Sequence, residues 1–441
     1  MTMRACFIEC CPQESRGSMG AHYILAAARA AGFEIDELDY EDGTLGYDVE
    51  LCSVHHCTDW PWLADAPRRA PVRLVGGHVM ANNPRPGLRY GDAFCVGEGE
   101  SWIAAALQAL ADGGAAKDLT RLPGTLVPAL WDGRRIAPNE ERPLPRHAPY
   151  LNRSAQRHAR TWYLELARGC PFACQYCELG WSVRYRPQDT GYLLSALEQI
   201  DRGQSSHVSL FAPDEASHRG YPQILQKIHD LGLVTQFGSM RLDQIMRRQD
   251  LPFKRNMLIR VGLDGLTEES RKRVGRDLRD DDVVEYMRWM ADRGHVSFKF
   301  FMIFGFPWEA YRDFEAWELL MDRILTLPRK QSAKLRIKFT PFIPQPSTPL
   351  SDAEPIYDER MVERILGWFH RKLRPRSVPG WYVESEGLMS ARSHAEQILL
   401  TRGDEGVIDE WRGLGYRRLV RPEKSWRPKS RDGLRKYRHR P

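Results

Sequence analysis

Residues 165–178 read Glu165-Leu-Ala-Arg-Gly-Cys170-Pro-Phe-Ala-Cys174-Gln-Tyr-Cys177-Glu178. Three cysteines stand within eight residues in the spacing C-x-x-x-C-x-x-C, and three thiolates that close together make a metal site. An apolar stretch with strand character, 161–166, precedes them, and Gly169 and Pro171 allow the sharp turn that such a loop needs.

The spacing also indicates which metal the thiolates hold. Structural zinc takes four protein ligands, usually as two Cys or Cys/His pairs, and no second pair follows Cys177 at a suitable distance. An iron–sulfur cube has four irons, so Cys170, Cys174 and Cys177 can hold three and leave the fourth open to a small molecule. The sequence therefore predicts a [4Fe-4S] cluster with one open iron.

With Tyr176 just before the last cysteine, this loop resembles the cluster loop of the radical S-adenosylmethionine (SAM) enzymes. The resemblance implies that the open iron chelates the amino and carboxylate groups of SAM. It also implies that one electron from the cluster cleaves SAM to a 5′-deoxyadenosyl radical, with flavodoxin or ferredoxin as electron donor. Nine cysteines in a chain without a signal peptide favour a reducing, cytoplasmic location.

Strands and helices alternate from the loop to about residue 344. This order predicts a partial (β/α)6 barrel, whose catalytic residues lie at the C-terminal ends of the strands. A proline-rich stretch, 340–349, cannot continue as a helix or a central strand and resembles the end of the same core. The expected strands are 163–167, 207–211, 235–239, 258–263, 297–304 and 335–339.

The ends of these strands carry groups suited to SAM. The segment with Asp214 and Glu215 resembles the motif that receives the SAM amino group, and either acid suits that role. Relatives use residues matching Ser239 and Arg241 on the ribose and carboxylate of SAM, and an arginine fork suits a carboxylate.

Two further strand ends and the loop tyrosine complete the expected SAM site. Asp264 is expected to hold a ribose hydroxyl or a substrate group. Main-chain groups of Ile303 and Phe304 are expected to contact adenine, and Gly305 permits the close approach. Tyr176 is counted with these cofactor-binding residues.

The chain before the loop is predicted to be a Rossmann-like α/β domain. Strands are expected at 3–8, 33–38, 48–54, 71–75 and 92–96, with helices at 21–31 and 101–111. Gly76, Gly77, Gly97 and Glu98 follow two strands, at the edge where such sheets bind ligands.

Together with the core, this segment resembles the cobalamin-binding domain that precedes many radical SAM cores, which implies cobalamin as a cofactor. In classical cobalamin folds a D-x-H-x-x-G motif supplies a histidine to cobalt. The first turn here, 14–20, lacks that motif, so a bound cobalt would lack that ligand.

Six further cysteines lie in this domain, and methylthiotransferases of the same superfamily hold a second cluster on three N-terminal cysteines. Gly76-Gly77 stands where the third is expected, which favours the cobalamin-type fold, and the six cysteines are expected to be small buried hydrophobic side chains. His55-His56-Cys57 also invites a metal interpretation, but adjacent strand residues point to opposite faces. The six are Cys6, Cys10, Cys11, Cys52, Cys57 and Cys95.

The expected domains are 1–120, a linker at 121–155, the barrel at 156–345 and a small C-terminal domain at 346–441. The chain carries a net charge of +6, and residues 417–441 alone hold eleven Lys/Arg against two Asp/Glu. This tail is either a solvated segment or an anchor for nucleic acid. No 18-residue apolar run appears, so no membrane contact is expected.

The leading prediction is a cobalamin-dependent radical SAM C-methyltransferase acting on a small or peptidic substrate. One alternative keeps the radical without cobalamin, as a dehydratase, epimerase, decarboxylase or group-transfer enzyme. A second is a nucleic-acid modification enzyme that uses the basic tail.

Overall fold

The structure is a computed structural model that describes residues 3–152, 160–236, 238, 240–248, 250–254, 257–295, 297–328, 332–357, 359–372 and 380–417. Ser239 and residues 418–441 of the basic tail lie outside the described residues. Among the described helices, none is both long and apolar enough to span a bilayer.

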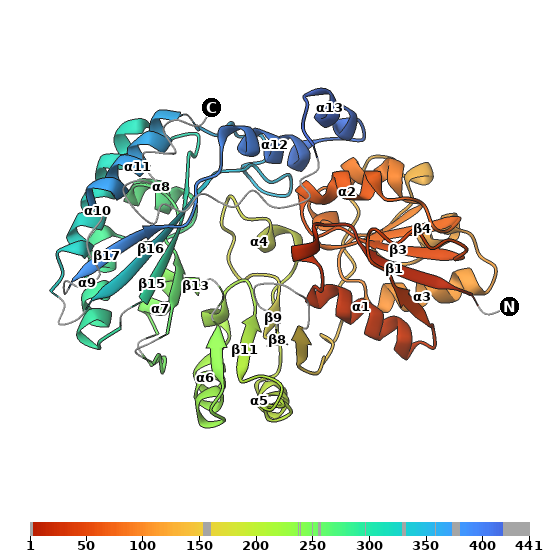
Figure 1. Cartoon of the computed structure of the whole chain (residues 1–441), viewed down its shortest axis with the longest axis horizontal. Coiled ribbons are helices and arrows are strands. Elements are labelled where there is room, and N and C mark those ends of the chain that lie inside the picture. The colour runs from red at the N-terminus through yellow and green to blue at the C-terminus, as the bar shows by residue number, and fades with distance from the viewer. Residues whose placement is uncertain are drawn as a thin grey trace.

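The N-terminal part forms a six-stranded sheet with helices on both faces (Figure 1). The strand order is β2-β1-β3-β4-β5-β6, and all pairs are parallel except the last. The Rossmann-like fold predicted for this part is confirmed. The strands are β1 (Ala5–Glu9), β2 (Ile35–Glu37), β3 (Val49–Ser53), β4 (Val72–Gly76), β5 (Ala93–Cys95) and β6 (Thr125–Leu126).

Each face of this sheet has its own hydrophobic core. One core contains residues of α1 (Met19–Ala30) and α3 (Glu100–Ala111), and the other contains residues of α2 (Trp60–Asp65). Along α1 the core residues Ala21, Leu25 and Ala28 recur at helical spacing, so one stripe of the helix faces the sheet. The order β2-β1-β3 places the topological switch point between β1 and β3, where such sheets bind ligands.

The middle of the chain forms a partial barrel from two sheets, β12-β11-β8-β7 and β13-β14-β15-β16-β17 (Figure 1). Neighbouring strands are parallel except β7, which is antiparallel to β8. One hydrophobic core extends over both sheets, which confirms the predicted barrel class. The strands are β7 (Tyr150–Asn152), β8 (Thr161–Glu165), β11 (His207–Phe211), β12 (Val234–Gln236), β13 (Met240–Arg241), β14 (Ile259–Gly262), β15 (Ser297–Phe304), β16 (Ala333–Pro341) and β17 (Trp381–Ser385).

Helices alternate with these strands and pack against them. In β15 buried and partly exposed residues alternate, and Phe304 packs edge-on against Phe314 at the start of α10. This period of two places one face of the strand against the helices and the other toward the barrel interior. The helices are α5 (Thr190–Glu198), α6 (Tyr221–Asp230), α7 (Leu242–Met246), α8 (Glu268–Arg273), α9 (Asp280–Asp292), α10 (Phe314–Leu325) and α11 (Glu359–Lys372).

Two details of the barrel differ from the sequence prediction. The third strand, expected at 235–239, is represented by β12 and β13, which belong to different sheets. The proline-rich exit begins later than predicted, because β16 continues through Thr340 and Pro341. β17 pairs with β16 only as far as Ile337. Pro341 therefore has no strand on that side to which a main-chain N–H would have to donate, and a proline is tolerated there.

The segments outside the predicted N-terminal domain and barrel contribute elements to both of them. Within 121–155, β6 pairs with β5 and β7 pairs with β8, so this stretch contributes a strand to each part. After the barrel, β17 extends the second sheet, whereas α12 (Ala391–Arg402) and α13 (Val407–Gly413) pack on the N-terminal domain through Leu400 and Trp411 (Figure 1). The domain boundaries themselves stay a prediction.

Candidate functional site

The cysteine loop leaves the barrel at the C-terminal end of β8. Gly169 adopts a φ of +67°, and a Cβ there would lie 2.3 Å from the carbonyl oxygen of Arg184, so the turn requires glycine. Three short elements hold the loop in place: β9 (Ala167–Arg168), its partner β10 (Arg186–Pro187), and α4 (Leu179–Ser182).

The three loop cysteines are free thiols. Burial raises the pKa of Cys170 to about 11 and that of Cys177 to about 12, so these thiols keep their protons at neutral pH until a metal replaces them. Soft thiolates on one loop suit iron–sulfur chemistry. As the side chains stand, no three His, Cys, Asp or Glu residues in the described ranges form a group that could hold a metal ion.

Arg241 lies directly against the cysteine loop. Its Nη1 donates to Cys174 Sγ at 2.9 Å, and its guanidinium covers the Phe172 ring at 4.1 Å. Asp243 receives two hydrogen bonds from the same guanidinium, at 3.0 and 2.9 Å, and orients it. The structure therefore brings the predicted carboxylate-binding arginine to the predicted cluster.

Asp214 and Glu215 are both buried, but they face different partners. Asp214 accepts a hydrogen bond from the Arg241 main-chain N–H at 2.7 Å. Glu215 accepts one from Tyr221 Oη at 2.7 Å and another from the Gly238 N–H, and burial raises its pKa to about 7 despite these bonds. Asp214 is thus bonded to Arg241, the residue that contacts the cysteine loop, whereas Glu215 has a pKa near neutrality.

Tyr176 and Asp264 meet across 88 residues of sequence. Tyr176 Oη donates to Asp264 Oδ2 at 2.7 Å, and Arg276 bonds to both, at 2.7 Å to the hydroxyl and 2.5 Å to the carboxylate. Asp264 also accepts the Ile303 N–H at 3.1 Å. Arg276 was missed at the sequence level, because it lies in a loop between α8 and α9 with no recognisable motif.

The main chain at the end of β15 is already engaged within the protein. The Ile303 carbonyl accepts the Gly265 N–H at 2.9 Å, and the Phe304 carbonyl accepts the Phe342 N–H at 2.8 Å. Gly305 has a φ of +83°, and a Cβ there would lie 2.3 Å from a main-chain oxygen. The glycine is therefore required by this turn, and adenine contact at these groups stays a prediction.

A cavity of about 730 Å³ lies between the carboxyl ends of the N-terminal strands and the cysteine loop. The predicted ligand-edge residues Gly76, Gly77, Gly97 and Glu98 all line it. Gly169 of the cysteine loop lines the opposite wall, together with the end of β11. The cavity is therefore shared by the two domains.

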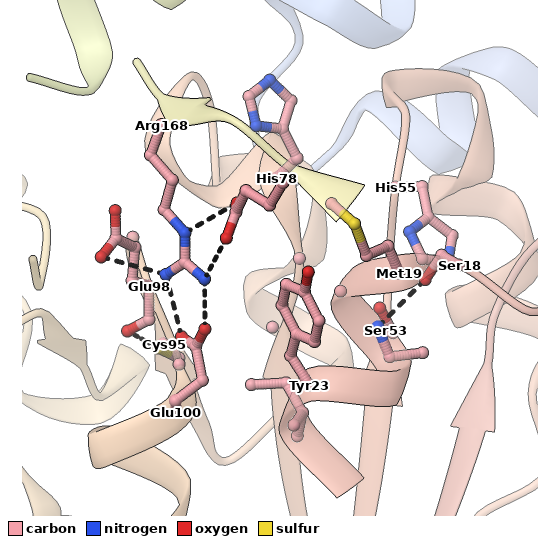
Figure 2. Close-up of a pocket in the computed structure, with 18 of the residues that line it drawn as sticks. Ser18, Met19, Tyr23, Ser53, His55, His78, Cys95, Glu98, Glu100 and Arg168 are labelled. Atoms are coloured by element: carbon pink, nitrogen blue, oxygen red, sulfur yellow. Dashed lines mark hydrogen bonds and ion pairs between the residues drawn. The ribbon is translucent and has the colours of Figure 1, made fainter. Parts of the chain in front are cut away.

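Arg168 forms the charged side of this cavity (Figure 2). Its guanidinium pairs with Glu98 at 3.2 Å, Glu100 at 2.5 Å and Glu165 at 2.9 Å, and Arg186 pairs with Glu98 as well. Glu98, predicted to bind a cofactor, is thus held by arginines from the barrel. Arg168 stands inside the loop motif itself, and its position two residues before Cys170 was the signal available in the sequence.

Among the described residues, the remaining cysteines and histidines form no group of three that could hold a metal ion, although the side chains of Cys10 and Cys52 are hydrogen-bonded. Cys6, Cys10, Cys11, Cys52, Cys57 and Cys95 are all buried free thiols. His55 Nε2 lies 3.0 Å from Glu9 Oε1, whereas His56 Nδ1 lies 2.8 Å from Thr58 Oγ1. The two neighbouring histidines therefore have different partners, although they follow β3 and do not lie in a strand as predicted.

Comparisons with known proteins place this geometry in context. No family model matches the chain. An uncharacterized protein of Methanocaldococcus jannaschii is 23% identical over 256 residues, which cover 57% of this chain and 54% of that relative. The match thus spans about half the length of the relative.

Solved structures give a closer likeness in fold. The radical SAM methyltransferase TsrM of Kitasatospora setae, with cobalamin and a [4Fe-4S] cluster bound, aligns with a TM-score of 0.59 and 13% identity over 80% of this chain and 77% of TsrM. TsrM with tryptophan and the SAM analogue aza-SAM gives a TM-score of 0.60 and 13% identity over 79% and 75%. The chain therefore shares the fold of TsrM over about four fifths of its length.

Proposed function

We propose that the protein is a radical SAM enzyme that binds a [4Fe-4S] cluster, SAM and cobalamin, and methylates a carbon of a small or peptidic substrate. The observation that carries this proposal is the cavity of about 730 Å³ between the N-terminal strand ends and the cysteine loop. TsrM, which shares the fold, holds cobalamin and a cluster in its structure.

The walls of the cavity fit a large organic cofactor. Gly20 and Gly76 line it, and a Cβ on either would meet no heavy atom closer than 3.9 Å, so the main chain there is open to a ligand. Tyr23, Ile24 and Trp102 add apolar surface on the same side. Cavities of about 300–1,000 Å³ with mostly apolar walls and a few polar groups are typical of cofactor sites.

The chain's own residues supply the charges that SAM needs. When bound, the cluster supplies the electron that cleaves SAM, and cobalamin supplies a methyl group. Cys170, Cys174 and Cys177 would hold the cluster. Arg241 offers a guanidinium beside it for the SAM carboxylate, and Asp214 offers a carboxylate for the SAM ammonium. An electron donor such as flavodoxin or ferredoxin belongs to the same proposal.

Anaerobic reconstitution followed by iron and cobalt analysis, visible absorption and an assay for 5′-deoxyadenosine tests this function. Alanine variants of Cys170, Cys174 and Cys177 should each lose iron, while the matched variant Cys6→Ala should keep it. Zinc in place of iron, or no 5′-deoxyadenosine with reductant and SAM, would refute the radical chemistry. Iron without cobalt would leave the cobalamin-free alternative.

A further inference from the structure

A histidine and a carboxylate stand together at the switch point of the N-terminal sheet. Glu9 ends β1, and His55 follows β3 by two residues; Glu9 and Ser53 are paired neighbours in the two strands. His55 Nε2 lies 3.0 Å from Glu9 Oε1. Because the carboxyl ends of β1 and β3 flank the switch point, this pair lies where the fold binds ligands.

The carboxylate is fixed by the main chain. Glu9 accepts hydrogen bonds from the N–H groups of Gly17 and Ser18, at 2.5 and 3.2 Å, and its side chain is only 10% exposed. The Gly17 N–H reaches Oε2 and the Ser18 N–H reaches Oε1, so both oxygens of the carboxylate act as hydrogen-bond acceptors.

This arrangement decides which nitrogen of His55 carries the proton. Both oxygens of Glu9 accept main-chain N–H groups, so the carboxylate also acts as the acceptor toward His55, and Nε2 is the N–H donor. In the neutral ring, Nδ1 then holds a lone pair, and the described residues offer it no hydrogen-bond partner. A carboxylate that holds one ring nitrogen while the other is open is the arrangement of metal-binding histidines.

His55 is among the residues that line the cavity, and Glu9 is not. Figure 2 shows His55 beside Met19 and Ser18, on the other side of Tyr23 from the Arg168 network. The side chain of His55 is 24% exposed, so a ligand can reach it without unfolding the loop. The histidine thus faces the cavity from the N-terminal domain, opposite the cysteine loop.

We propose that His55 binds the cobalt of a corrinoid through Nδ1, with Glu9 as the residue that positions it. This inference rests on the proposed function, because it needs cobalamin in the cavity. The histidine comes from the end of β3, so the missing D-x-H-x-x-G motif of the first turn does not leave cobalt without a protein ligand.

A second cavity histidine offers a matched control. His78 also lines the cavity and lies 3.1 Å from a carboxylate oxygen of Glu178 through Nε2. Glu178 belongs to the barrel and follows Cys177 directly, so His78 bridges the domains on the cluster side. Its side chain is 46% exposed, and its partner is not held by main-chain N–H groups of the N-terminal turn as Glu9 is. His55 is therefore the better-fixed ligand.

Electron paramagnetic resonance of the cobalt(II) form tests the inference with isotopes. Full-length protein carrying ¹⁵N in all histidines is reconstituted with unlabelled cobalamin and reduced. It is measured at a temperature where a reduced iron–sulfur cluster is not seen. Coordination by a protein histidine splits each cobalt line into a doublet, whereas the cofactor's own benzimidazole gives a triplet. We expect the doublet in wild type and in His78→Ala, and its loss in His55→Ala with the cobalt content unchanged.

The Glu9→Gln variant separates positioning from ligation. It keeps the size of the side chain and should bind the same amount of cobalt while showing the doublet in a smaller fraction of the molecules. A triplet or unsplit lines in labelled wild type that holds cobalt, or a doublet that survives His55→Ala, would overturn the inference and leave the proposed function standing. Failure of wild type to retain cobalt would remove both.

Discussion

Arg168 joins the cysteine loop to both domains, and replacing it by methionine tests how much this junction stabilises the protein. Its guanidinium pairs with Glu98 at 3.2 Å, Glu100 at 2.5 Å and Glu165 at 2.9 Å. These four side chains are between 8% and 12% exposed, so water screens the pairs weakly. Methionine keeps an unbranched chain but leaves the three carboxylates without this cation.

The magnitude follows from Glu100. Burial by itself raises the pKa of this carboxyl group, but hydrogen bonds from His147 and Arg168, with the Arg168 charge, lower it from 4.5 to about 2. At about 1.4 kcal/mol per pKa unit, this difference is worth about 3 kcal/mol of stability. Breaking a buried ion pair by removing one partner costs about 3–5 kcal/mol. We therefore expect Arg168→Met to lower the free energy of unfolding by about 3 kcal/mol at neutral pH.

The stability difference between wild type and Arg168→Met should depend on pH in a defined direction. Because the folded-state pKa of Glu100 lies below its unfolded value, its contribution is fully present above about pH 4.5 and is lost as the pH falls toward about 2. Burial raises the pKa of Glu165 even beside Arg168, and removing Arg168 raises it further. Both carboxylates are thus harder to ionise in the variant, so its deficit in stability should shrink on acidification.

Denaturant unfolding followed by tryptophan fluorescence, at about pH 7 and about pH 3.5, measures both effects. Arg29→Met is the control, because its pair with Glu37 is half exposed and such pairs are worth less than about 1 kcal/mol. A variant as stable as wild type at neutral pH, or a deficit that does not shrink with acid, would refute this account.

Four further substitutions test other parts of the structure. Burial raises the pKa of Glu215 to about 7, so its cost to folding appears as the pH rises from about 4.5 to about 7. Between about pH 5 and about pH 8, the free energy of unfolding of Glu215→Gln should therefore fall by about 3 kcal/mol less than that of wild type. Denaturant unfolding measures both, and an equal dependence of stability on pH in the two proteins would contradict burial as the cause. Tyr176→Phe removes a buried hydroxyl bonded to an aspartate and an arginine, and should lower the free energy of unfolding by about 2 kcal/mol; an unchanged denaturation midpoint would show that these bonds contribute nothing. Gly77→Ala should cost more than about 2 kcal/mol, since φ is +123° and the new Cβ would lie 2.0 Å from the Val54 carbonyl oxygen. Gly20 lies in a helix and its added Cβ would meet open space, so Gly20→Ala should stabilise the protein by up to about 1 kcal/mol. The thermal unfolding midpoint should therefore fall for Gly77→Ala and rise for Gly20→Ala. Midpoints that shift in the same direction would contradict the geometry.

Much of the fold was readable because its signals are local. The buried strands and the amphipathic helix α1 repeat with periods that depend on a few neighbouring residues, and the cysteine loop carries its metal chemistry within eight positions. The glycines at the ends of β4 and β5 line the cavity, because the carboxyl ends of parallel strands share one edge, and their contact with a cofactor stays a prediction. Gly169 was predicted to allow a turn, whereas Gly305 was predicted only to permit the approach of adenine, and its close contact with the Ile356 carbonyl oxygen depends on the tertiary structure.

The sequence by itself determined the α/β class, most of the barrel strands and the candidate cluster ligands. Tertiary structure alone decided which side chains meet: Arg168 with Glu98 and Glu100, Tyr176 with Arg276, and His55 with Glu9. It also decided that α12 and α13 cover the N-terminal domain. The physical reason is that hydrophobic periodicity depends on neighbours along the chain. A polar contact between residues 46 to 100 positions apart depends instead on strand order and on how the two domains dock.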